Sequence, residues 1–206
     1  MSRSSLTVRA ARAWIDGRFQ PAQIRVEDGV IVAVGPVSGA PRRAVVVPDD
    51  AVLLPGLVDS HVHVNEPGRT EWEGFTSATL AAAAGGVTTI VDMPLNSLPP
   101  TTTAEALAIK KAAAAPSAFV DVGFWGGAVP DNLGALAPLH AAGVFGFKCF
   151  LSPSGVDEFP HLDRAQLLAA MTEIAALGSR LIVHAEDPAL LAADGPLGRS
   201  YDAFLA

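Results

Sequence analysis

Two histidines lie two residues apart in the segment DSHVH at residues 59–63. Alternate residues of a strand point to the same face, so Asp59, His61 and His63 are expected on one face. Two imidazoles on one face can bind one metal ion, and imidazole is the commonest metal ligand in proteins. Two unrelated histidines on a half-buried strand are the alternative, but the loop NEPGR follows at once. That loop favours a metal site at the carboxyl end of a strand.

Two further polar side chains stand at the ends of apolar runs. Lys148 lies in VFGFKCFL, residues 144–151, and His184 lies in RLIVHAED, residues 180–187. A lone histidine in such a place is more often a satisfied core residue than a ligand. Together with DSHVH, however, three predicted strands carry three imidazoles and one amine toward the same end of the sheet.

A lysine within an apolar strand needs an explanation, because buried strands rarely keep an unpaired ammonium. Burial lowers the pKa of a lysine and frees its amine. A free amine can add CO2 to form a carbamate, a carboxylate-like group whose two oxygens can bridge two cations. A Schiff base and an ion pair with a carboxylate are the alternatives for Lys148, and the local residues do not separate them.

The elements that must position these residues change in character near residue 55. Short β-branched runs with turn signals such as Asp28-Gly29 occupy the first part and predict strands. Beyond it, strand-like and helical stretches alternate, which predicts βα units on a parallel sheet with both faces covered. The predicted helices are 72–84, 102–115, 131–142 and 164–177, and the strands between them include 87–94 and 118–129.

The number of βα units limits the architecture. From Gly56 to Ala206 there are five predicted strands and about four helices that follow them. A closed (β/α)8 barrel needs roughly 250 residues, so a barrel would be incomplete here. An open doubly wound sheet, for which five strands suffice, is the alternative.

Composition excludes several classes of protein. Of the 206 residues, 50% are hydrophobic and 17% charged, as in a soluble globular protein with ample core. The net charge of −7 without a basic run argues against nucleic-acid binding. No apolar stretch predicts a membrane span or a signal peptide, and Cys149 has no second cysteine to pair with. The cytoplasm is the expected location.

The segment LLPGLVDSHVHVNEPGR, with a lysine on the fourth strand and a histidine on the fifth, resembles the cyclic amidohydrolases. This branch of the amidohydrolase superfamily includes dihydroorotase, hydantoinase/dihydropyrimidinase and allantoinase. The resemblance implies an α/β fold, the first half of a (β/α)8 TIM-type barrel preceded by part of a small β-sandwich. Residues 1–55 would supply the sandwich strands, and residues 56–206 about four and a half βα units of the barrel.

The resemblance also implies a dinuclear metal site. His61 and His63 would bind the first metal, Lys148 carboxylated on Nζ would bridge the two metals, and His184 would bind the second. The family's sixth-strand histidine and eighth-strand aspartate, the general base, are expected downstream of Ala206. This polypeptide alone is therefore expected to be inactive.

Position 65 distinguishes branches of this family. Dihydroorotases resemble one another in HxHxR, whose arginine meets the substrate carboxylate, whereas Asn65 stands here and suits an uncharged ring. The segments EPGRTEWEGF, MPLNSLPPT and GFKCF resemble allantoinases most. This implies hydrolysis of the hydantoin ring of allantoin to allantoate. Dihydroorotase or hydantoinase/dihydropyrimidinase activity is the alternative, as is a non-catalytic fragment that serves as an assembly module.

Loop residues near the strand ends are candidates for substrate contact or support. Asn65, Arg69 and Asn96 follow the first two barrel strands and are expected to contact substrate, with plain loop structure as the alternative. Asp59 is expected to orient an imidazole, or to be a buried structural carboxylate. His140 and His161 are expected on the surface.

The same resemblance implies cofactors and partners. Two divalent metal ions, with zinc as the expected metal, would lower the pKa of a shared water, and CO2 would carboxylate the lysine. The expected partners are the small molecule allantoin and further copies of the chain in a homo-oligomer, a tetramer when full length. Nucleic acid and membranes are not expected as partners.

Overall fold

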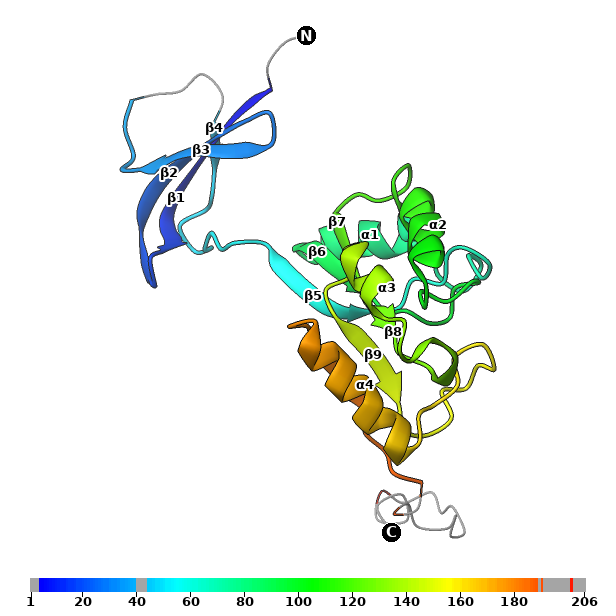
Figure 1. Ribbon diagram of the computed structural model, residues 1–206. Coiled ribbons are helices and arrows are strands. Elements are labelled where there is room, and N and C mark those ends of the chain that lie inside the picture. Colours follow the sequence, from blue (N-terminus) through cyan, green and yellow to red (C-terminus); the bar gives the residue numbers. More distant parts are fainter. Residues whose placement is uncertain (1–3, 40–43, 189, 191–200, 202–206) are drawn as a thin grey trace. The chain divides into compact units, whose positions relative to one another are not determined.

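The computed structural model of the chain describes residues 4–39, 44–188, 190 and 201. The chain divides into two compact units, Met1–Gly56 and Leu57–Ala206. Strands follow one another directly in the first unit and alternate with helices in the second (Figure 1). The predicted α/β class is therefore confirmed.

The first unit contains a four-stranded sheet with the order β3-β2-β1-β4. β1 pairs antiparallel with β2, β2 pairs antiparallel with β3, and β4 lies parallel to β1. Both hairpin turns, Asp16-Gly17 and Asp28-Gly29, have positive φ at their two central residues, as a type I′ turn requires. The strands are β1 (Ser5–Ile15), β2 (Arg18–Glu27), β3 (Val30–Gly35) and β4 (Ala44–Val46).

The core of the first unit is small. Ala10, Ala13 and Ala22 are buried, whereas Val30 and Ile31 are 64% and 61% exposed. Alanines bury little apolar area, so this sheet has little core of its own among the described residues.

The second unit contains two parallel three-stranded sheets with the orders β5-β6-β7 and β10-β9-β8. Figure 1 shows the helices interspersed with these strands. Among the described residues, no helix combines the length and apolar character that crossing a membrane requires. The elements are β5 (Leu57–Val62), α1 (Phe75–Ala84), β6 (Val87–Asp92), α2 (Ala104–Ala114), β7 (Asp121–Phe124), β8 (Gly126–Gly127), the 3-10 turn η1 (Pro130–Asn132), α3 (Ala137–Ala141), β9 (Phe147–Phe150), α4 (Arg164–Ala176) and β10 (Leu181–His184).

The predicted strand 118–129 is two strands, which belong to different sheets. Trp125 separates them: its N–H donates to Asp92 O, and the N–H of Gly126 donates to Gly146 O. Glycine is needed beyond this point because other side chains lie against the backbone. A Cβ at Gly127 would lie 2.5 Å from the Phe159 ring, closer than van der Waals contact allows.

Helix boundaries follow their capping residues. The predicted helices 102–115 and 164–177 are confirmed as α2 and α4, whose N-caps Thr103 and Asp163 accept hydrogen bonds from backbone N–H groups. The predicted helix 72–84 begins later, at Phe75, because Glu66 accepts the Phe75 N–H and the preceding residues form a loop.

The predicted helix 131–142 is wrong in extent, because only a 3-10 turn and the five-residue α3 form there. Asn132 explains the interruption. Its side chain accepts the Val129 N–H and donates to the carbonyls of Thr102 and Gly127. Side-chain bonds of this kind compete with continued helix formation.

Two apolar clusters lie on opposite sides of β9. Phe147 and Cys149 belong to the cluster that includes residues of α2 and α4, whereas Phe150 packs against a second cluster around Trp125 and Phe159. Cys149 is completely buried and packs within the first of these clusters. Alternation along the strand places Lys148 on the same side as Phe150.

The expectation that every strand of this unit is covered on both faces is wrong for β5. Leu57 and Val58 are 56% and 64% exposed. Within the described part of the chain β5 has only β6 as a neighbour, and β10 has only β9. An edge strand leaves one row of backbone groups and adjoining side chains uncovered.

Candidate functional site

The end of β5 holds the first two candidate ligands. β5 ends at Val62, so His63 lies just beyond it, and the pairing with β6 is irregular between Asp59 and Val62. Despite this irregularity, the ring centroids of His61 and His63 are 5.5 Å apart. The structure therefore brings these two imidazoles together.

The electrostatic surroundings keep His63 neutral. Burial, together with the charges of His61, Lys110 and Lys148, lowers the pKa of His63 to about 4, and burial is the largest of these causes. At neutral pH the His63 imidazole therefore has a free lone pair, as a metal ligand must. The effect of Lys148 on this pKa also places the lysine within electrostatic range of the strand-end histidines.

Several contacts fix the backbone at this end of β5. The indole Nε1 of Trp125 donates to Ser60 O at 2.9 Å. The N–H of Met93 donates to Val62 O at 2.7 Å. The segment that carries both histidines is thereby joined to β6 and to the junction between β7 and β8.

Lys148 is nearly buried, with 5% of its surface exposed. Its Nζ lies 4.8 Å from the centroid of the Phe150 ring, and burial lowers the pKa of this lysine. Among the described residues no carboxylate forms an ion pair with Lys148. These observations favour the neutral amine and give no support to the carboxylate-pair alternative.

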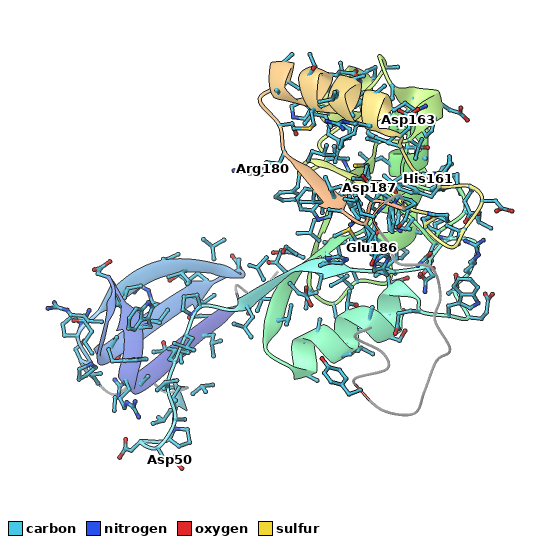
Figure 2. The ribbon with its side chains drawn as sticks, turned by 90° about the horizontal axis from the view of Figure 1, so that it is seen from below. Asp50, His161, Asp163, Arg180, Glu186 and Asp187 are labelled. Carbon is cyan, nitrogen blue, oxygen red and sulfur yellow. The ribbon has the colours of Figure 1, made fainter. Side chains whose placement is uncertain are left out.

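His184 contacts the same aromatic ring as Lys148, that of Phe150. Its ring stacks on Phe150 with centroids 4.9 Å apart, and its Nε2 is 3.2 Å from Glu186 Oε2. Figure 2 shows Arg180 before β10 and Glu186 beyond the other end of that strand. Lys148 and His184 therefore form a second group of donors around one aromatic ring.

The donor types fit divalent metal ions. The described residues include no group of three or more histidine, cysteine or carboxylate side chains close enough to hold a metal. They provide instead a pair of imidazoles, His61 and His63, and a separate pair of one amine and one imidazole, Lys148 and His184. Imidazole nitrogen suits zinc and similar ions, and a carbamate would add oxygen ligands.

Arg69 connects three loops. Its Nη1 donates to Asn96 O at 2.9 Å and to Glu158 Oε1, and its guanidinium lies 4.9 Å from the Trp72 ring centroid. These contacts join the loops that follow β5, β6 and β9. Arg69 is thus held by protein groups, and its expected contact with substrate remains a prediction.

Two asparagines lie near the histidines. Asn96 has a positive φ of 74°, and its Nδ2 is 3.5 Å from His63 Nδ1. Asn65 is buried, and its Oδ1 has no hydrogen-bond partner among the described residues. A buried unpaired amide oxygen costs free energy, so Asn65 is a candidate for binding a donor group from outside the chain.

The Arg69–Glu158 contact predicts a pKa that NMR can measure. The hydrogen bond from Arg69 is the first cause that holds the pKa of Glu158 below its ordinary value of 4.5. Because this pKa is lowered by folding, the contact stabilises the protein above pH 4.5, and the stabilisation is lost as pH falls through the lowered value. In Arg69→Met, the midpoint of the Glu158 carboxyl ¹³C titration should rise toward the ordinary value.

Arg164→Met, which removes an exposed arginine elsewhere in the same unit, is the matched control and should leave the Glu158 midpoint unchanged. An equal shift in both variants would mean that general charge, and not the direct contact, sets this pKa.

The structure places three other candidates, Asp59, His140 and His161, each with a different outcome. Asp59 Oδ1 accepts the backbone N–H of His61 at 3.1 Å, and its contact with an imidazole ring remains a prediction. His140 is half-buried, because its ring stacks on Phe147 at 6.3 Å, so the expected surface position is wrong. His161 is exposed, as expected.

Sequence analysis missed a buried ion pair beside the histidines. Lys110 Nζ lies 2.6 Å from Asp92 Oδ2, and both side chains are completely buried. A signal was present, because VTTIVDMP places an acidic residue in an apolar strand just as VFGFKCFL places a lysine in one. The partner could not be found in this way, since Lys110 lies on an alanine-rich helix beside a second lysine.

The chain resembles known proteins in sequence and in fold. The family model described as "Amidohydrolase family" matches residues 52–194. Among solved structures, an L-hydantoinase (dihydropyrimidinase) from Arthrobacter aurescens superposes with a TM-score of 0.81 at 33% identity. That match covers 90% of this chain and 41% of the hydantoinase chain.

Relatives with higher identity are allantoinases. The allantoinase of Streptomyces avermitilis is 58% identical over 209 residues, covering 100% of this chain and 47% of the relative. A mitochondrial allantoinase of Aquarana catesbeiana is 58% identical over 137 residues, covering 66% of this chain and 28% of the relative. The chain thus spans about half or less of the length of these relatives. Since the family model matches more than half of its residues, this chain belongs to the amidohydrolase family.

Proposed function

We propose that the whole protein hydrolyses the cyclic amide of allantoin to allantoate, a step of purine catabolism. The observation that carries this proposal is the grouping of His61 with His63 and of Lys148 with His184 at strand ends. The identity of 58% to an allantoinase along the entire chain supports the choice of substrate. Asn65, which suits an uncharged ring, supports it too.

The proposed architecture is the first half of a (β/α)8 barrel, residues 56–206, preceded by β-sandwich strands, residues 1–55. The hydantoinase superposition supports this reading. A homo-oligomer, a tetramer by family resemblance, and a cytoplasmic location are parts of the same proposal. One relative carries the description "mitochondrial", so location can differ within the family.

In the proposed site, His61 and His63 would hold one divalent metal ion and His184 would hold a second, with zinc as the proposed metal. Lys148, carboxylated on Nζ by CO2, would supply carboxylate-like oxygen ligands to the metal ions. Bound metal ions would supply Lewis-acid polarisation of the amide carbonyl and a water of lowered pKa.

The chain's own residues prepare this site. Burial lowers the pKa of His63 to about 4 and also lowers the pKa of Lys148. The His63 imidazole is therefore neutral at neutral pH, and the Lys148 ammonium loses its proton more easily, as carbamate formation requires. Phe150 shields the Lys148–His184 group on one side. Glu186, 3.2 Å from His184 Nε2, can accept a hydrogen bond from the imidazole N–H and so select which ring nitrogen faces the site.

Substrate would be held by the loops beside the site. The unpaired Oδ1 of Asn65 can accept a ring N–H of a hydantoin, and Asn96 lies beside His63. Arg69 keeps the loops in place through Glu158 and Asn96 O, and Asp59 supports the backbone of His61. Hydrolysis adds water across one amide C–N bond: the oxygen bonds to the carbonyl carbon and the leaving nitrogen takes a proton. The proposed general base, an aspartate, lies outside these 206 residues.

The test is metal analysis and parallel assays of the full-length protein on allantoin, dihydroorotate and hydantoin. We expect up to two divalent ions per chain and the highest kcat/KM for allantoin. Active protein without metal would overturn the proposed chemistry, and a higher kcat/KM for either other ring would overturn the proposed substrate. His140→Gln, on α3 and away from these groups, is the control variant and should retain metal and activity.

A further inference from the structure

We propose that the buried ion pair of Lys110 and Asp92 positions His63 and Asn96 for the reaction, by fixing the backbone that carries both. Neither side chain touches the proposed metal ligands directly, so both are positioning residues. The inference rests on the proposed function for the predicted effect on activity. The positioning role itself rests on the geometry of the ion pair.

Lys110 reaches from α2 to the carboxyl ends of β5 and β6. An ammonium has three N–H groups, and three oxygen atoms lie within 3.0 Å of this one. They are Asp92 Oδ2 at 2.6 Å, Val64 O at 2.8 Å and Ser97 Oγ at 3.0 Å. The ammonium thus has two hydrogen-bond acceptors and one ion-pair partner inside the protein, and none of the Lys110 side chain is exposed.

Asp92 completes the arrangement from the other side. Its Oδ1 accepts the backbone N–H of Val64 at 2.7 Å. The two partners of the ion pair therefore bind both polar backbone groups of Val64, the residue that directly follows His63. Few backbone positions outside regular structure are held at both ends by a buried charged pair.

The pair also reaches the second loop. Ser97, which accepts from Lys110, directly follows Asn96, whose positive φ of 74° is unfavourable for a residue with a side chain. The Asn96 amide lies 3.5 Å from His63 Nδ1. One ammonium thus connects the segment of His63 to the segment of Asn96, and these two side chains meet.

A purely structural role would not need this chemistry. Burying an ion pair carries a large desolvation cost, and well-packed apolar side chains of similar volume often stabilise a fold as well or better. Apolar side chains at 92 and 110 could fill the space, but they could not bind Val64 N–H, Val64 O and Ser97 Oγ. What the ion pair adds is a defined backbone position next to His63.

The test compares variants of the full-length protein loaded with Co²⁺, whose visible absorption reports ligand geometry. Lys110→Met, of similar length without the charge, should bind Co²⁺ about 10–100-fold more weakly. It should also lower kcat for allantoin by about 10²-fold, the effect expected of a displacement near 1 Å, with a smaller change in KM. Ser97→Ala, which removes one of three acceptors, should lower kcat roughly fivefold.

Lys111→Met is the matched control, since Lys111 is the next residue on the same helix and, among the described residues, its side chain donates to Ala142 O alone. It should leave Co²⁺ affinity, spectrum and kcat unchanged. Circular dichroism and thermal melting show which variants fold.

A folded Lys110→Met protein with wild-type Co²⁺ affinity, spectrum and kcat would contradict the proposal. If Lys110→Met does not fold, the Ser97→Ala variant tests the proposal instead. An unchanged kcat in Ser97→Ala would then contradict the proposal. Failure of the proposed function gives a different result: wild-type protein would then bind no metal or open none of the rings, whatever residue stands at 110.

Discussion

Replacing Lys148 with methionine is expected to lower kcat/KM for allantoin by at least about 10²–10³-fold, the scale of losing one electrostatic stabiliser of a transition state. Lys148 is buried, with its Nζ 4.8 Å from the centroid of the Phe150 ring, and among the described residues it has no carboxylate partner that would explain it as a structural ion pair. Methionine keeps the length of the side chain and its packing but cannot form a carbamate. Metal content, measured on the same preparation, should fall together with the rate.

Lys148→Arg separates carbamate chemistry from positive charge. A guanidinium stays protonated in proteins and cannot add CO2, so this variant should be as inactive as Lys148→Met. Wild-type protein exchanged with ¹³C-labelled bicarbonate should show a carbamate ¹³C signal that both variants lack. Substantial activity in Lys148→Arg would mean that a cation at this position suffices, and the proposed bridge would be wrong.

Replacing Asp92 with alanine is expected to lower the free energy of unfolding by about 3–5 kcal/mol, because it leaves a buried charge without its partner. Lys110 would keep Val64 O and Ser97 Oγ as acceptors but lose the carboxylate 2.6 Å away. Burial already lowers the pKa of Lys110 and raises that of Asp92 to about 6, so each charge depends on the other. Urea denaturation of the full-length variant measures the loss.

Asp157→Ala is the control for this experiment. Asp157 is exposed in the same unit, so its removal should change the free energy of unfolding by no more than about 0.5 kcal/mol. The double variant Asp92→Ala/Lys110→Met removes both charges and should recover part of the loss. If Asp92→Ala is as stable as the wild type, the two buried groups are not mutually dependent.

The local sequence was sufficient to predict those features of the fold that depend on residues close together in the chain. The alternation of strand and helix in the second unit, and helices α2 and α4 with their caps, follow from periodicity and capping residues. The pairing of His61 with His63 follows from their spacing, although an irregularity in β5 modifies the strict alternation on which that expectation rested.

Features that depend on distant residues were not predicted. The run 118–129 reads as one apolar strand, yet it divides at Trp125 because its two halves pair with different neighbours. The helix expected over 131–142 is interrupted because Asn132 bonds to Thr102 O, thirty residues away. His140 looked like a surface residue because only the fold brings Phe147 against it.

The sequence by itself determined which donor groups stand at the strand ends: His61, His63, Lys148 and His184. The types and local spacing of these four residues are visible in short segments of the sequence, and a short segment is enough to assign a residue to a strand. Only the tertiary structure decided what holds them. The hydrogen bonds to Val64 come from Asp92 of β6 and Lys110 of α2, and Lys148 and His184 contact the same Phe150 ring. Such contacts depend on packing between separate elements, and residue spacing along a chain does not encode the distance across a fold.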